Sequence, residues 1–188
     1  MKKLFAVLLA FVMLLTFAAC SEDAPQKENT ESEQTPNSAE PTGTTYDTGC
    51  FNVFVPDGWY AIPSTDVFAE DSNTLNPKQL QICKGGSSDF DIFTKPFIRI
   101  DYYDPTTEMV PPDKEWYDEA EDIDPVTIGT RTWTGFEAVS MDYPFTCLYV
   151  EEDGHKYQVT IYTEQDDGSI SMTDADVQAI IASIAPSK

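Results

Sequence analysis

Histidine, the side chain that most often serves in acid–base catalysis and metal binding, occurs once in the 188 residues, at His155. It follows Asp153 and Gly154, which together predict the tip of a hairpin, so we expect its ring to be solvated. Without this imidazole no serine has a base, and the S-x-x-K spacing of a serine–lysine pair does not occur. The sequence therefore predicts no catalytic residue and no cofactor.

Acidic side chains gather in two runs, at residues 118–124 and 166–176. Carboxylates bind Ca²⁺ and also form the acid–base pairs of glycosidases, so both chemistries are open to them. Neither run has the D-x-[DN]-x-[DN]-G spacing, with a glutamate at position 12, that marks an EF-hand. We expect a solvated acidic face and no dedicated metal site. Loose Ca²⁺ binding and a hydrolase that uses acidic residues are the alternatives.

Cysteine occurs four times, at Cys20, Cys50, Cys83 and Cys147. No pair has the C-x-x-C spacing of a zinc or thioredoxin-type site. The last three lie in or beside predicted strands and allow at most one intramolecular disulfide, and the sequence does not choose the pair. Buried free thiols are an equal alternative.

Tyrosine supplies the candidate binding residues, in a chain whose aromatic content is 12%. Tyr103 and Tyr149 each alternate with aliphatic neighbours, which places them on the sheet face opposite those neighbours. Tyr102 shares the aliphatic face and would be exposed only at a sheet edge. An acidic face rich in tyrosine suits contact with a peptide or a carbohydrate, so Tyr102, Tyr103 and Tyr149 form the predicted binding face.

The elements that would position these residues are mostly strands, because apolar and polar residues alternate with a period of two. Pro56-Asp57-Gly58 predicts a turn into Trp59, and Asp153-Gly154 predicts a hairpin. A further hairpin is predicted around Thr134 and Gly135. The predicted strands cover residues 51–55, 80–83, 97–103, 126–133, 136–143, 145–151 and 156–163.

Two segments have helical spacing instead. In 112–123 the apolar residues fall at i, i+4 and i+7, and Pro112 suits a helix start. From Val177 to Ile184 they fall at i, i+3, i+4 and i+7, with Thr173 as the predicted N-cap and Pro186 ending the helix. The prediction is one α+β domain, an antiparallel sheet of about six or seven strands covered by a middle helix and a C-terminal helix.

The first twenty residues predict a targeting signal rather than part of the folded domain. Lys2 and Lys3 precede a twelve-residue apolar run, which is the length of a signal-peptide core and shorter than a membrane span. The run ends in Ala18-Ala19-Cys20, which resembles a bacterial lipobox and implies cleavage before Cys20 and a diacylglycerol on its sulfur. We therefore assign 1–19 as a lipoprotein signal peptide and expect the chain to be extracytoplasmic, anchored to the bacterial membrane through Cys20. The alternative is an ordinary secretory signal in which the cysteine is incidental.

Residues 20–45 predict a disordered tether and residues 46–188 the folded domain. Between Ser21 and Thr45 there is no aromatic residue and no Val, Ile, Leu or Met, so this segment cannot offset the entropy of ordering. The chain has a net charge of -22, and 46–188 retains 8 basic and 27 acidic residues. This excludes a basic patch for nucleic acid and favours a cationic partner or one bridged by divalent cations.

Three motifs carry a family resemblance: Phe51-x-Val-x-Val-Pro-x-Gly-Trp59, Trp133-x-Gly-Phe136 and the terminal stripe that contains Ser183. In their order they resemble the PsbP-like α/β/α sandwich, which also occurs in small bacterial lipoproteins of unknown function. The resemblance covers most of 46–188 and implies that fold. The family's photosynthetic role is not implied, because it needs a partner complex that nothing in the sequence indicates.

Together these features predict a lipid-anchored domain that serves as a non-catalytic binding or assembly module at the cell envelope. Its ligand is not indicated by the sequence. The alternative is an envelope hydrolase that uses acidic residues. A shallow sheet face rich in tyrosine would favour binding, whereas a deep cleft lined by two carboxylates with raised pKa values would favour hydrolysis.

Overall fold

The structure is a computed structural model and describes residues 40–71 and 73–188. The predicted signal peptide, Cys20 and most of the predicted tether lie outside these residues. The end of the tether was placed too late, because strand β1 begins at Gly43 and pairs antiparallel with β2. Thr44 and Thr45, read from the sequence as tether, have the β-branched side chains that strands favour. They become ordered by joining the edge of an existing strand.

The described residues form twelve strands, one α-helix and two short 3₁₀ helices. In chain order they are β1 Gly43–Asp47, β2 Phe51–Pro56, β3 Trp59–Thr65, β4 Leu75–Lys84, η1 Asp89–Phe93, β5 Phe97–Tyr103, η2 Lys114–Trp116, β6 Asp118–Ile128, β7 Arg131–Ser140, β8 Tyr143–Glu152, β9 His155–Tyr162, β10 Glu164–Gln165, β11 Gly168–Ser169, α1 Ala175–Ser183 and β12 Ala185–Pro186.

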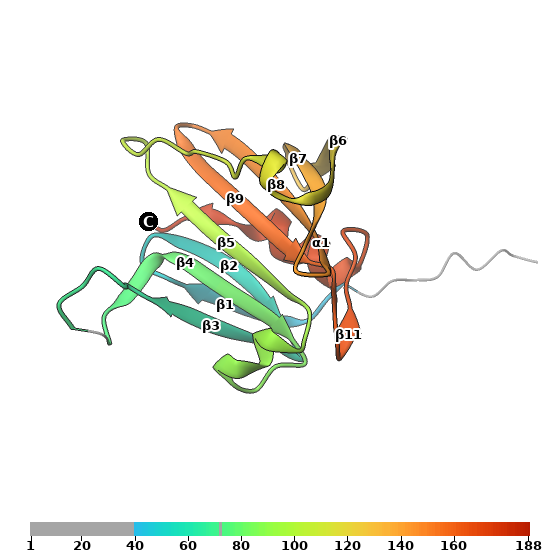
Figure 1. Cartoon of the computed structure of the whole chain (residues 1–188). Coiled ribbons are helices and arrows are strands. Elements are labelled where there is room, and N and C mark those ends of the chain that lie inside the picture. The colour runs from blue at the N-terminus through green and yellow to red at the C-terminus, as the bar shows by residue number, and fades with distance from the viewer. Residues whose placement is uncertain (1–39, 72) are drawn as a thin grey trace, which may run out of the picture. The chain divides into compact units, whose positions relative to one another are not determined.

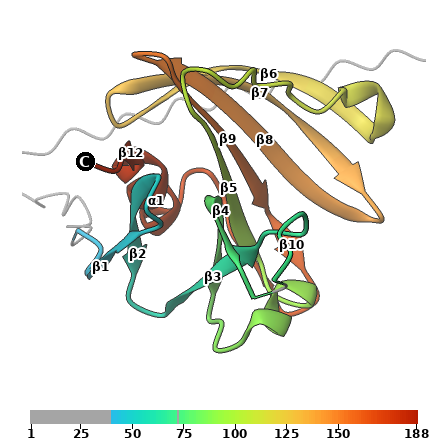
Figure 2. The ribbon, with the colours of Figure 1, turned by 90° about the vertical axis from the view of Figure 1, so that its left-hand side faces the viewer.

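Seven of these strands form one antiparallel sheet in the order β3-β4-β5-β9-β8-β7-β6 (Figure 1). The predicted sheet of about six or seven strands and the α+β class are confirmed. The sheet curves, and α1 lies on one side of it together with the small sheet β1-β2-β12 (Figure 2). We call this side of the seven-stranded sheet the covered face and the other side the open face.

The predicted middle helix at 112–123 is wrong. Only η2 is helical there, and the rest is the edge strand β6. The register of β6 against β7 shifts twice, once between Ile123 and Val126, so these two residues pack into the same core although they are three positions apart. The three residues of the helical spacing do not share a face: Trp116 is 82% exposed, Ala120 packs against the small cluster on the open face, and Ile123 packs into the main core.

One predicted hairpin is confirmed and one is wrong. Asp153 and Gly154 have φ of 51° and 80° and join β8 to β9. Gly135, by contrast, lies inside β7, and the turn into β8 is at Met141 and Asp142. A Cβ on Gly135 would lie 1.8 Å from the backbone oxygen of Cys147. The glycine is therefore required by the close approach of two strands and not by a turn.

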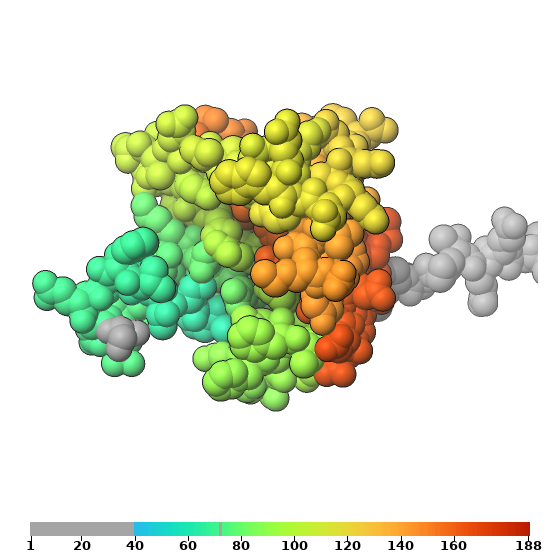
Figure 3. Space-filling view, in the orientation of Figure 1, coloured from blue at the N-terminus to red at the C-terminus, as the bar shows by residue number. Residues whose placement is uncertain are grey.

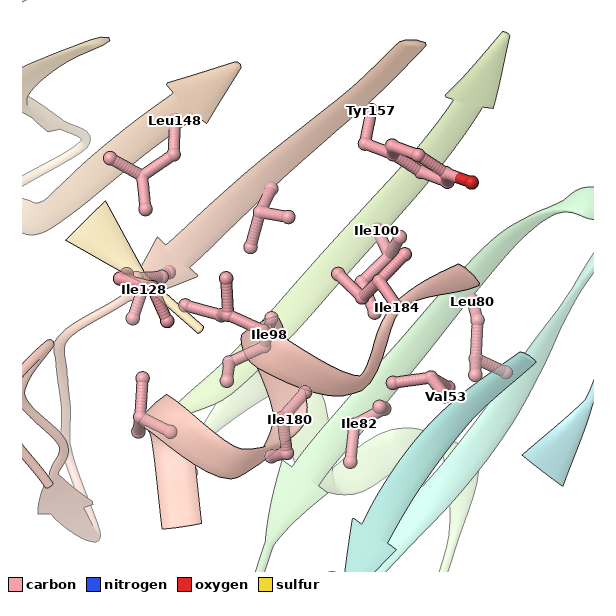
Figure 4. Packing of buried hydrophobic residues seen from close by; sticks show 14 of the residues in the cluster. Val53, Leu80, Ile82, Ile98, Ile100, Ile128, Leu148, Tyr157, Ile180 and Ile184 are labelled. Atoms are coloured by element: carbon pink, nitrogen blue, oxygen red, sulfur yellow. The ribbon is translucent and has the colours of Figure 1, made fainter. Parts of the chain in front are cut away.

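The core fills the space between the covered face, β2 and α1. Alternate residues of β2 face inward, and the apolar stripe of α1 is buried as predicted (Figure 4). The buried helix residues are Val177, Ile180, Ile181 and Ile184. The cap differs from the prediction, because Asp174 and not Thr173 is the N-cap residue. Asp174 is one residue nearer the first buried position of the helix.

Three polar contacts fix α1 against the strands. The indole Nε1 of Trp59 donates to Asp176 Oδ2 at 3.0 Å, and the backbone N–H of Phe54 donates to Ser183 Oγ at 2.7 Å. Arg131 donates to the backbone oxygen of Ile184 at the other end of the helix. The helix is thus held at both ends, and its apolar stripe cannot rotate away from the core.

Both edges of the seven-stranded sheet are irregular. The outer strand β3 contains Pro63, where its register with β4 begins to shift. The outer strand β6 contains Pro125 and most of the acidic run 118–124 in exposed positions. Proline lacks the N–H that a further strand would need, and bulges twist an edge away from such pairing.

Candidate functional site

The open face of the sheet carries three parallel rows of side chains from β4, β5, β9 and β8. The first row is mainly aromatic, the second is polar except for a cysteine at its end, and the third is polar and ends in a tyrosine. In strand order the rows are Cys83, Phe97, Tyr162 and Phe145, then Gln81, Arg99, Thr160 and Cys147, then Gln79, Asp101, Gln158 and Tyr149. The same strands that build the core thus present a mixed surface on their other side.

The aromatic row is held by ring contacts. Phe97 and Tyr162 stack with ring centroids 4.2 Å apart, and Tyr117 meets Phe145 edge-on at 4.9 Å. Phe136 on β7 meets Phe145 in the same way at 5.9 Å. Burial raises the pKa of Tyr162, so its phenol stays neutral at physiological pH. These rings form a rigid apolar wall beside the polar rows.

An ion pair lies in the polar rows. Arg99 donates to both carboxylate oxygens of Asp101, from Nε at 2.9 Å and from one terminal nitrogen at 3.0 Å. Gln79 donates to the same carboxylate at 2.6 Å, and Asp101 is buried. Burial of Arg99 opposes its charge, but the hydrogen bonds and charge of Asp101 outweigh this and raise the pKa of the guanidinium. These hydrogen bonds fix the two side chains in place on the open face.

Two adjoining hollows open onto this face, and both are lined by Ser140 and Tyr162. The apolar hollow lies between η1 and the turn from β7 to β8 and has a volume of about 320 Å³. The polar hollow, about 240 Å³, lies over Arg99 and beneath the segment that contains Pro112 and Tyr117. Figure 3 views this side of the molecule, which is hollowed between the 85–96 segment and the β7–β8 segment. We call the two hollows together the cleft.

Each hollow is lined by a nearly buried glutamine that makes no side-chain hydrogen bond to another described residue. Gln158, 8% exposed, lies in the polar hollow, and Gln165, 9% exposed, lies in the apolar hollow. Neither carboxamide is fully cut off from solvent, because the fully buried side-chain polar atoms without a partner in the described residues are Trp133 Nε1 and Tyr157 Oη. Both amides can therefore hydrogen-bond a molecule that enters the hollow.

Of the predicted binding face, Tyr103 and Tyr149 lie on the open face as expected and Tyr102 does not, and none of the three lines the cleft. Tyr103 and Tyr149 lie on the open face, half-buried, and burial raises the pKa of both phenols. Tyr102 is on the covered face and is 7% exposed in the core. It was expected to be exposed only at a sheet edge, and β5 lies in the middle of the sheet, so Tyr102 is not part of the site.

His155 is half-buried rather than simply solvated. Its Nδ1 lies 2.7 Å from the hydroxyl of Tyr102, and the two rings stack. The expectation failed because the β8–β9 turn folds back against β5, the next strand in the sheet. This pair closes the end of the core and lies on the opposite side of the sheet from the cleft.

The acidic runs and the cysteines do not gather into a metal site. Within residues 40–71 and 73–188, no group of three or more His, Cys, Asp or Glu side chains could hold a metal ion. The sequence left open either one disulfide or free thiols for the cysteines of the domain. The structure shows free thiols at Cys50, Cys83 and Cys147. Burial raises the pKa of Cys147 to about 11. A further hollow of about 250 Å³ is lined by Glu119 and Glu137, both exposed.

Sequence reasoning singled out none of the residues that line the cleft as candidate binding residues, Arg99, Gln158 and Tyr162 included. The available signal was the alternation itself: in 97–103 and 156–163 the residues between the core positions include an arginine, a glutamine and a tyrosine. Assigning those positions to one face requires the strand register, because the cleft joins residues more than 50 positions apart.

Comparison with known proteins adds no functional assignment. No family model matches the chain, and no curated protein matches it. Among solved structures, a crystal structure of a protein from Bacteroides thetaiotaomicron VPI-5482 is similar at 14% identity with a TM-score of 0.41. The match covers 78% of this chain, which spans only about half (49%) of that structure. Among the described residues no helix is long and apolar enough to cross a membrane.

Proposed function

We propose that this chain is a lipid-anchored extracytoplasmic domain that binds a ligand in the cleft on its open face and does not transform it chemically. The observation that carries the proposal is the pair of adjoining hollows, one apolar and one polar, each lined by a glutamine whose carboxamide has no side-chain hydrogen bond to another described residue. Concave sites that combine apolar walls with a few polar groups are typical of binding sites.

The rim of the cleft supports the same proposal. Phe93 beside the apolar hollow is 69% exposed and Met141 is 89% exposed. Trp116, next to Tyr117 of the polar hollow, is 82% exposed. Large apolar side chains at the mouth of a hollow are costly in water, and they are typical of surfaces that a partner covers.

The proposed lipid anchor and extracytoplasmic location are supported by the N-terminal segment of the sequence. A diacylated Cys20 would provide two chains, enough for stable attachment to a membrane. The PsbP-like assignment is proposed with it, supported by the strand, the turn into Trp59, the meander and the terminal helix. The strand β6 in place of a middle helix counts against that assignment. Hydrolysis is not proposed, because no described observation favours it over binding.

The experiment on binding uses two matched variants of the full chain, Phe93→Ser at the cleft and Phe68→Ser on the β3–β4 loop, where Phe68 is 95% exposed. Both variants remove an exposed phenyl ring, so both should fold like the wild type. The probes are immobilised arrays of glycans and of random heptapeptides. Binding that Phe93→Ser abolishes and Phe68→Ser preserves supports the cleft. Equal binding by all three proteins, or none, contradicts it.

The anchor is tested separately with Cys20→Ser. Metabolic labelling with a fatty-acid probe should disappear in this variant, and the protein should leave the membrane fraction. Unchanged labelling would show that Cys20 is not the lipid attachment site.

A further inference from the structure

We propose that the ligand of the cleft is an extended basic peptide: a large apolar side chain enters the apolar hollow, the two carboxamides bind the peptide backbone, and Lys or Arg side chains lie along an acidic rim. The inference rests on the proposed function and specifies its ligand. Three independent features of the cleft carry it: the lining of the apolar hollow, the positions of Gln158 and Gln165, and the charges around the mouth.

The apolar hollow selects for a hydrocarbon or aromatic group. Its walls are Ile92, Phe93, Phe97 and Met141, with the rings of Tyr143 and Tyr162. A volume of about 320 Å³ accommodates a phenylalanine or leucine side chain. A sugar ring carries hydroxyls around its whole edge, and most of them would lose their hydrogen bonds to water here without replacement. The lining therefore favours a peptide over a carbohydrate.

The two carboxamides match the peptide backbone. A glutamine side chain presents an N–H donor and a C=O acceptor together, and a peptide unit presents the complementary pair. Gln158 lies in the third row of the open face, beside Asp101, and Gln165 lies in β10. The polar and apolar hollows that they line are adjoining, so a single extended chain can reach both.

The charges at the mouth favour a cationic peptide. Asp142 follows Met141 in the β7–β8 turn, Asp166 follows Gln165, and Asp89 begins η1; all three are exposed. The cations on this side are already paired with carboxylates, Arg99 with Asp101 at 2.9 Å, Lys95 with Asp91 at 3.5 Å and Lys114 with Asp122 at 2.6 Å. The charge that remains unpaired among these described residues is negative, which attracts Lys and Arg and repels acidic peptides.

The test uses the full chain purified in detergent and an immobilised array of random heptapeptides, alongside an array of glycans. Bound heptapeptides should be enriched in one large apolar residue together with Lys or Arg. Resynthesis of a bound peptide with its apolar residue replaced by Ser, or its Lys and Arg by Glu, should weaken binding at least tenfold. Binding should also weaken as NaCl rises from 0.05 to 0.5 M, because the Debye length shortens.

Variants of the protein connect this preference to the cleft. Gln158→Leu and Gln165→Leu should each weaken binding of the resynthesised peptide about tenfold, whereas Phe68→Ser should leave it unchanged. Phe93→Ser, at an exposed position, keeps the test valid if a glutamine variant fails to fold. Loss of binding in Phe93→Ser with wild-type affinity in Phe68→Ser is the expected result.

The outcomes that overturn the inference differ from those that overturn the proposed function. Glycan binding alone, abolished by Phe93→Ser, would leave the cleft a binding site and show that its ligand is a carbohydrate. Enrichment of acidic heptapeptides would overturn the charge argument. Peptide binding that neither Phe93→Ser nor the glutamine variants reduce would overturn both proposals, as would the absence of binding on both arrays.

Discussion

The two faces of the seven-stranded sheet are built from the same strands and differ in almost every property. On the covered face Ile82, Ile98 and Ile100 are 0% exposed and belong to one apolar cluster with residues of α1 and β2. On the open face Arg99 lies between Phe97 and Asp101, half-buried, under a cleft. Side chains alternate between the two faces along a strand. One segment can therefore stabilise the fold with one set of side chains and present polar and aromatic groups to a ligand with the other.

This difference shows which side-chain properties each face of the sheet requires. The covered face needs volume and hydrophobicity, and conservative exchanges of aliphatic residues would preserve it. The open face holds its polar groups in place with rings and an ion pair, because a binding site needs fixed donors and acceptors. Substitutions on the covered face should therefore change stability strongly, and substitutions on the open face should change it little.

The largest effect is expected for Ile181→Asp on the helix that covers the sheet. Ile181 is 0% exposed, so the aspartate would place an unpaired charge in the core and destabilise the fold by about 3–5 kcal/mol. Urea denaturation monitored by tryptophan fluorescence measures the change. Ala175→Asp, at the exposed start of the same helix, is the control and should unfold at the wild-type midpoint. Equal midpoints for both variants would show that α1 does not cover the sheet as described.

A smaller loss of stability is expected for Gly135→Ala, which tests the close approach of β7 and β8 within the sheet. The added methyl group would meet the backbone oxygen of Cys147, and relieving that contact costs about 1–3 kcal/mol. Thr134→Ala, at the exposed neighbouring position, should cost much less. Thermal melting of both variants measures the difference. If Gly135 were instead in a turn, alanine there would not meet β8 and the melting temperatures would be similar.

A still smaller effect is expected for Arg99→Gln on the open face. It leaves the buried carboxylate of Asp101 with Gln79 as its only side-chain donor, and we expect a loss of about 1–2 kcal/mol because Arg99 is partly in solvent. The double variant Arg99→Gln with Asp101→Asn should recover part of the loss, since no charge then stays buried. A double variant less stable than Arg99→Gln would contradict this account of the pair.

The smallest effect is expected at the rim of the covered face, where Lys78 donates to Asp104 at 2.7 Å. Hydrogen bonds from Lys78 and Thr106 hold the pKa of the Asp104 carboxyl well below its ordinary value. A carboxylate with a lowered folded-state pKa stabilises above its unfolded pKa, and that stability is lost as pH falls. Asp104→Asn should therefore melt slightly below the wild type at pH 7, and the difference should shrink below pH 4. A difference that grows with acidity would contradict the assignment.

The sequence predicted the elements whose signals are local. The β8–β9 turn followed from Asp153 and Gly154, and the buried stripe of α1 followed from the spacing of its apolar residues. It failed where a distant strand decided the outcome. Gly135 resembles a turn residue in the sequence, but glycine is required there by the backbone of Cys147 in β8. Residues 112–123 have helical spacing in the sequence, but Trp116, Ala120 and Ile123 lie in three different environments.

The cleft was not predicted, for a related reason. Alternation placed Tyr103 and Tyr149 on the open face, but neither residue lines the cleft. Tyr162, Gln158 and Arg99 required the order of strands, which places β9 between β5 and β8. Local patterns therefore indicate which residues share a face of one strand. They do not indicate which strands meet to form a cleft.

The irregular edges of the large sheet have a consequence for copies of the protein that share one surface. A proposed lipid anchor would confine the copies to two dimensions, where encounters between sheets are frequent. At β3 an incoming strand would lack the donor that Pro63 cannot supply, and at β6 it would meet Pro125 and a run of exposed carboxylates. The edges therefore oppose polymerisation of the protein into a continuous sheet along the membrane, even at high surface density.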